Sequence, residues 1–134
     1  MAASRILSID ETDVNGLRKQ DGARNISLVL FGISLLVFKS RYSGPFETFV
    51  HSYVGNISVS FAIYFLALHI PFKTQQIRMW AACIALATVE LFDGFGLMSN
   101  VYDSWDLVAN LAGIASAFAL DSVLSNRQRA ATNA

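Results

Sequence analysis

Four apolar segments, at residues 26–38, 56–72, 79–92 and 107–124, divide the sequence and constrain its fold more than any other feature. They are 13 to 18 residues long, shorter than the roughly 20 residues of a helix that crosses a membrane. Arginine and lysine side chains at their ends can snorkel to the interface, and nearby tyrosines and tryptophans suit the interfacial belts, so flanking residues can extend each span. The segments lack the polar face that helices of a soluble bundle need. We therefore predict an all-α polytopic membrane protein with a four-helix transmembrane bundle.

The composition agrees with a membrane protein. Of the 134 residues, 54% are hydrophobic and only 15% are charged, which is too apolar for an ordinary soluble domain of this length. The ten basic and ten acidic residues balance, and no clustered basic face suggests a nucleic-acid partner. We expect no nucleic-acid binding.

Basic residues are distributed unevenly between the tails and connections. Eight of them fall in the two tails and in the second connection, whereas only Lys39 and Arg41 fall on the other side. Because basic residues are enriched on the cytoplasmic side, this distribution predicts that both termini are cytoplasmic. The chain then consists of a tail at residues 1–24, a membrane domain at 25–124 and a second tail at 125–134. The first and third connections face outward.

The first connection, "SGPFETFVHSYVGN", carries helical signals. Pro45 suits a first helical position, and apolar residues follow it at three- and four-residue spacing: Phe46, Phe49, Val50 and Tyr53. This pattern predicts a short amphipathic helix on the outer membrane surface or, equally, the first turns of the second spanning helix.

Polar residues lie inside the predicted helices near their outer ends. Glu90 follows the apolar run "WAACIALATV", and a carboxylate there must face protein or water rather than lipid. Asn110 lies a full turn deeper in the fourth helix than the acids before it, so its amide needs a partner within the bundle. Those acids, Asp103 and Asp106, share its stripe, and acids at a helix start also serve as caps and complement the dipole.

The second and fourth segments each carry a stripe that predicts helix contacts. Small residues in the fourth segment allow another helix to approach closely: Ala109, Gly113 and Ala117. Polar residues in the second segment recur at steps of three and four: Tyr53, Asn56, Ser60 and Tyr64. If this row faces Glu90 and the stripe of Asp106 and Asn110, the outer half of the bundle encloses a polar, acidic pocket with aromatic walls. The residues predicted to bind a ligand there are Glu90, Asn110, Asp106, Asp103, Asn56 and Tyr64.

Catalytic and metal-binding motifs are absent from the sequence. It contains no nucleophile elbow, phosphate-binding glycine loop, HExxH or paired-cysteine motif. His51 and His69 have no partners at metal-ligand spacing, so we expect neither a metal nor another cofactor. We assign no catalytic residue and favour a non-enzymatic role. Enzymatic or transport activity with Glu90 as a proton carrier is a less favoured interpretation.

The segment "DSWDLVANLAG", preceded by an acid near the end of an apolar helix, resembles the VanZ-like family of small bacterial membrane proteins. In that family a Glu on the penultimate helix precedes a D-x-x-D-x-x-x-N-x-x-G pattern, and "FVHSYVGNISVSFAIYFLAL" is similar to its earlier part. The sequence departs from the family in having no Lys or Arg between Arg78 and Arg127. The resemblance implies a bacterial envelope protein of the inner membrane, covers residues 49–124 and points to Asn56, Glu90, Asp103, Asp106, Asn110 and Gly113.

Two interpretations of the function follow from these features. The first is an integral membrane protein of the bacterial envelope whose outer polar pocket binds a membrane lipid or an envelope precursor. The alternative is a non-catalytic accessory subunit of a larger membrane protein complex. The accessory role predicts an apolar helix face that contacts other subunits and no pocket.

Overall fold

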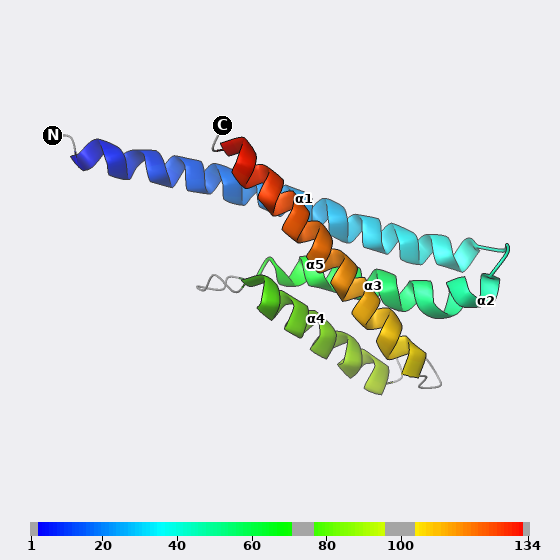
Figure 1. Ribbon diagram of the computed structural model, residues 1–134. Helices are drawn as coiled ribbons and strands as arrows, with labels where there is room; N and C mark the ends of the chain where they lie inside the picture. The colour runs from blue at the N-terminus through cyan, green and yellow to red at the C-terminus, as the bar shows by residue number, and fades with distance from the viewer. Residues whose placement is uncertain (1–2, 71–76, 96–103, 133–134) are drawn as a thin grey trace.

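The computed structural model describes residues 3–70, 77–95 and 104–132, and these are almost entirely helical (Figure 1). The chain forms α1 (Ala3–Arg41), the short α2 (Glu47–Phe49), a π-helical turn η1 (Val50–Val54) and α3 (Gly55–Ala67). It continues with α4 (Ile77–Gly94) and α5 (Ser104–Thr132). No β-strand occurs in these ranges, which confirms the predicted all-α fold.

α1 is longer than the first apolar segment. Its 39 residues correspond to a rod of about 58 Å at 1.5 Å per residue. The helix includes most of the predicted N-terminal tail, because no proline interrupts the chain before Pro45. Its first half projects beyond the other helices (Figure 1).

The chain reverses after α1 in a tight turn that leads directly into helix. Phe46 has a φ of 63°, a left-handed conformation that non-glycine residues seldom adopt. The Tyr42 hydroxyl donates to the carbonyl of Pro45 at 3.0 Å, and the Glu47 N–H donates to the carbonyl of Gly44 at 3.1 Å. Helical structure is then unbroken from Glu47 to Ala67. The structure therefore agrees with the second alternative for this connection, in which it forms the first turns of the second long helix.

Three helical stretches are long and apolar enough to cross a membrane: Asp21–Arg41, Glu47–Ala67 and Ser104–Ala131. α4 is not among them, since its 18 residues include Arg78, Glu90 and Asp93. Length and composition thus support an integral membrane protein with three spanning helices, and the fourth span stays a prediction.

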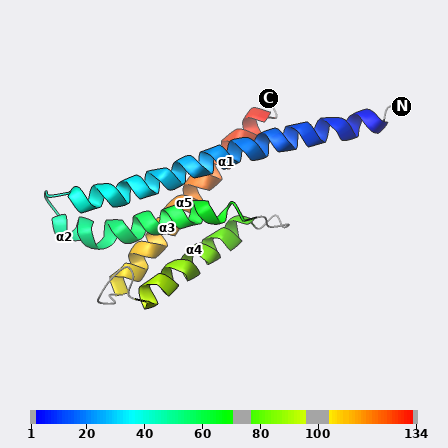
Figure 2. The same ribbon diagram turned by 180° about the vertical axis from the view of Figure 1, so that it is seen from behind.

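α3 is the central helix of the bundle. α1 lies antiparallel along one side of it, and α5 crosses it while running in the same general direction (Figures 1 and 2). α4 packs against both α3 and α5. Buried side chains from α3, α4 and α5 form the core: Phe61, Tyr64, Phe65, Ala67, Ala81, Ala85, Ile114 and Ala117. The aromatic residues come from α3, and small residues on its neighbours make room for them.

Two glycines mark the closest helix approaches. A Cβ atom at Gly113 of α5 would lie 2.5 Å from the carbonyl oxygen of Ile57 and 3.0 Å from the Cβ of Ser60, both on α3. A Cβ atom at Gly32 of α1 would lie 3.0 Å from the Cβ of Ala62, again on α3. Ala109 and Ala117 are buried on α5 one turn before and after Gly113. Small side chains therefore set the distance of both neighbours from the central helix.

Candidate functional site

A row of buried polar side chains follows the contact between α3 and α5. At the end of the bundle near α2, the Asn56 side-chain amide donates to Oδ1 of Asp106 at 2.7 Å, and both residues are buried. One turn further along both helices, the Ser60 hydroxyl donates to Oδ1 of Asn110 at 3.0 Å. Each pair joins residues 50 positions apart, because α3 and α5 run in the same direction with a constant register. Under the predicted orientation, this α2 end of the bundle faces outward.

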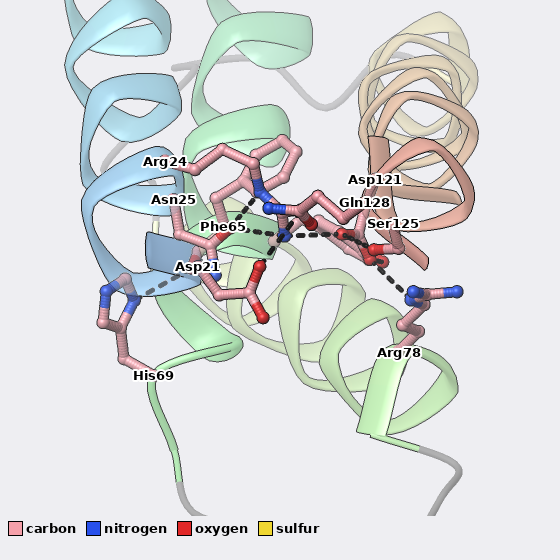
Figure 3. Close-up of polar contacts among 10 residues, drawn as sticks. Asp21, Arg24, Asn25, Phe65, His69, Arg78, Asp121, Ser125 and Gln128 are labelled. Carbon is pink, nitrogen blue, oxygen red and sulfur yellow. Dashed lines mark hydrogen bonds and ion pairs between the residues drawn. The ribbon is translucent and has the colours of Figure 1, made fainter. Parts of the chain in front are cut away.

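The opposite end of the bundle contains a buried carboxylate, Asp121 of α5 (Figure 3), that forms hydrogen bonds or ion pairs with side chains from every long helix. Arg24 of α1 donates through Nη2 to Oδ1 at 3.1 Å. Arg78 of α4 pairs through Nε with Oδ2 at 2.9 Å. The hydroxyl of Tyr64 on α3 donates to Oδ2 at 3.2 Å, and that of Ser125 donates to Oδ1 at 3.3 Å. We call this end of the bundle the Asp121 end.

Arg24 is held by several further groups (Figure 3). Its Nη1 donates to Oε1 of Gln128 at 2.7 Å, and its Nε and Nη2 both donate to Oδ1 of Asn25. Asp21 lies 3.4 Å from Nη1 and is about half exposed. The cluster therefore contains two guanidinium groups and two carboxylates, so its formal charges balance. Pairing of opposite charges together with hydrogen bonds makes ionised groups tolerable at low dielectric.

The structure brings some of the predicted ligand residues together and places others apart. Asn56 and Asp106 are paired with each other, and Asn110 is paired with Ser60. Tyr64 faces Asp121 at the opposite end of the bundle. Asp103 lies outside the described residues.

Glu90 of α4 and Asn110 of α5 each have one side-chain atom that finds no partner. Glu90 is partly exposed as a residue, but its Oε1 is buried without a hydrogen-bond partner in the part of the chain that the structure describes. The same is true of Nδ2 of Asn110, a residue that is fully buried.

Asp121 is the main residue that the sequence interpretation missed. The polar stripe noted on the fourth segment, through Asp106, Asn110 and Ala117, continues by one further four-residue step to Asp121. It is also the only charged residue between Asp106 and Arg127. Extending the stripe to the end of the apolar segment would have found it. Its two arginine partners were interpreted only as interfacial residues.

An apolar groove of about 350 Å³ lies between the start of α5 and the helix formed by α2, η1 and α3. Three aromatic side chains line it, those of Phe49, Tyr53 and Trp105, together with Ile57, Ala109 and Ala112. The groove is at the α2 end, where the sequence predicts a pocket with aromatic walls. Its lining is apolar rather than acidic, because the nearby Asn56 and Asp106 are buried against each other.

Comparisons with known proteins found no match: no family model, no curated protein and no solved structure is similar to this chain. The resemblance to the VanZ-like family stays a prediction.

Proposed function

We propose that the protein is a small envelope membrane protein, of VanZ-like type, that binds the hydrocarbon chain of a membrane lipid or of a lipid-linked envelope precursor. The observation that carries this proposal is the aromatic-lined groove at the α2 end. Its volume of about 350 Å³ falls within the range of about 300–1,000 Å³ that is common for small-molecule sites. The groove lies between two helical stretches that are apolar enough to lie in a membrane, so lipid chains reach it without passing through water.

The chemistry of the lining favours a hydrocarbon chain over a polar headgroup. Asn56 and Asp106, which are next in sequence to the groove-lining Ile57 and Trp105, already satisfy each other in a 2.7 Å hydrogen bond. Replacing that contact by a bond to a ligand would leave one buried polar group without a partner. Tyr53 and Trp105, in contrast, are residue types that gather where lipid chains meet headgroups. The chain of a bound lipid is therefore expected in the groove and its headgroup beyond it.

A second candidate function is supported by α1. In the apolar 18-residue window of the span Asp21–Arg41, only 11% is buried inside the structure, against 39% and 33% in the corresponding windows of the other two spans. Large apolar side chains such as Leu30, Val37 and Phe38 are more than half exposed on this helix. This face suits either lipid or a helix of another subunit, and the latter corresponds to an accessory subunit of a larger complex.

Quenching of Trp105 fluorescence by lipids with brominated acyl chains tests the groove. The measurement uses purified protein in mild detergent with Trp80→Phe, which leaves Trp105 as the remaining tryptophan. We expect saturable quenching in this background and a several-fold weaker response after Ala112→Phe, because the new ring fills the groove. Ala115→Phe is the matched control, since Ala115 is also exposed on α5 but does not line the groove.

Equal and non-saturable quenching in all three proteins would reject the lipid site. Identification of the molecules that co-purify in mild detergent separates the two candidate functions. A protein recovered in fixed proportion, in place of bound lipid, would favour the accessory subunit.

A further inference from the structure

Arg78 lies in the first turn of α4 and uses only one edge of its guanidinium group within the Asp121 end. Its Nε lies 2.9 Å from Oδ2 of Asp121. Its terminal nitrogens, Nη1 and Nη2, have no hydrogen-bond partner among the described residues, and neither of them is buried. Figure 3 shows one nitrogen of the group pointing away from Asp121. Two donor nitrogens of Arg78 are therefore open to the surroundings of the protein.

Arg24 differs from Arg78, because all of its guanidinium nitrogens donate to side chains of the protein. These acceptors belong to Asn25, Gln128 and Asp121. The negative charge of Asp121 is thus shared between two guanidinium groups, and the second acid of the cluster, Asp21, lies beside Arg24. Arg78 is the less compensated of the two arginines and also the more exposed one.

Arg78 lies near the depth at which the helices leave the membrane. The first candidate span begins at Asp21, which belongs to the same cluster. Trp80, two residues beyond Arg78 and about 3 Å further along α4, is about half exposed. Tryptophan side chains gather at the level of the lipid headgroups. The free nitrogens of Arg78 are therefore within reach of headgroup phosphates.

Further positive charge lies at the Asp121 end. Arg127 and Arg129 are exposed in the last turns of α5, and neither forms an ion pair within the described ranges. They follow Asp121 by about 9 and 12 Å along the helix, at 1.5 Å per residue. Their charges attract anions to this end of the bundle.

We propose that Arg78 binds the phosphate group of an anionic phospholipid from the membrane leaflet at the Asp121 end. Nη1 and Nη2 are paired donors in one plane, a geometry that matches two oxygens of a phosphate. Asp121 is a positioning residue, because its ion pair with Nε holds the guanidinium group with the Nη edge outward. Basic pockets between membrane helices bind anionic headgroups in this way. The site is separate from the aromatic groove, which lies at the opposite end and takes a hydrocarbon chain.

The test is native mass spectrometry of the protein released from detergent micelles that contain dioleoyl phosphatidylglycerol. All proteins carry Ala112→Phe, which fills the groove and removes it from the count. We expect one retained phosphatidylglycerol per chain and several-fold less retention of phosphatidylcholine, whose choline group offsets the phosphate charge. Arg78→Gln should lower the retention of phosphatidylglycerol several-fold.

Two further variants complete the test. Arg78→Lys keeps the charge beside Asp121 but not the paired donors, so we expect intermediate retention, and this variant keeps the test valid where Arg78→Gln does not fold. Arg41→Gln removes the same charge from an exposed arginine near the α2 end and should leave retention unaltered.

Equal retention of the two lipids overturns the proposal, as does equal retention of phosphatidylglycerol by Arg41→Gln and a folded Arg78→Gln or Arg78→Lys variant. Loss of all phosphatidylglycerol on introducing Ala112→Phe would assign the lipid to the groove instead. Inorganic phosphate added at the same concentration as the lipid should not displace it. Displacement under these conditions would identify a free phosphate ion as the ligand and exclude the lipid. Quenching of Trp105 reports on the groove alone, so the two sites stand or fall separately.

Discussion

Replacing Asp121 by asparagine tests whether this buried carboxylate holds the helices together. The substitution preserves the size of the side chain and one acceptor oxygen but removes the negative charge that faces Arg24 and Arg78. The two arginine side chains are only 17% and 29% exposed, so water replaces the lost charge incompletely. Arg24 keeps Asp21 at 3.4 Å, whereas Arg78 has no second acid among the described residues.

Removing one partner of a buried ion pair costs about 3–5 kcal/mol of stability. Because both guanidinium groups retain some contact with solvent and Arg24 retains Asp21, we expect the lower end, about 3 kcal/mol, for the loss in unfolding free energy of Asp121→Asn. The matched control is Asp21→Asn. It removes an acid from the same cluster, but this acid is about half exposed, so the expected loss is at most about 0.5 kcal/mol.

Unfolding is measured by titrating sodium dodecyl sulfate into protein in dodecyl maltoside micelles and following helix content by circular dichroism. Asp121→Asn should shift the midpoint to lower denaturant, and Arg78→Met should do the same. The double variant should lose much less than the sum of the two, because both changes remove the same interaction. Stability of Asp121→Asn equal to that of Asp21→Asn, or full additivity with Arg78→Met, would refute the role assigned to Asp121.

The same unfolding assay checks two further predictions. Gly113→Ala should destabilise the protein by about 1–3 kcal/mol, since the added methyl group overlaps the carbonyl of Ile57 and forces α3 and α5 apart. Gly94→Ala, where a Cβ meets nothing within 4 Å, is its control, and equal shifts for the two variants would contradict the close crossing. Asn56→Ala should cost about 1–3 kcal/mol because it leaves the buried Asp106 carboxylate without its amide donor. The further change Asp106→Ala should recover part of that loss, and a double variant less stable than Asn56→Ala would argue against this explanation.

Much of the helical architecture could be predicted from the sequence. Apolar runs bounded by charged and aromatic residues indicate membrane helices, because lipid selects for apolar side chains over the length of a span. The helix ends were less predictable. α1 and α5 continue well past their apolar segments, since the residues beyond them still favour helix while no longer matching a lipid environment.

For the candidate site, the sequence predicts which residues share a helix face but not which residues they contact. Periodicity correctly places Asn56, Ser60 and Tyr64 on one stripe of α3, but all three were expected at a single pocket. The structure gives them three different partners, Asp106, Asn110 and Asp121, spread along α5. A stripe specifies the face of a helix that a side chain occupies and not the depth at which another helix meets it.

The sequence by itself determined that the chain forms apolar helices suited to a membrane, and it determined which helix faces carry polar groups. Both properties depend on the spacing of apolar and polar residues along the chain and on the lipid that surrounds the helices. Only the tertiary structure decided which polar groups meet. Which polar groups meet depends on the rotation and register of neighbouring helices. These are set by the close approach of α5 to α3 at Gly113 and by the ion pairs of Asp121 with Arg24 and Arg78. The aromatic groove has the same origin, because its two walls come from segments about 50 residues apart that lie together only once those helices have packed.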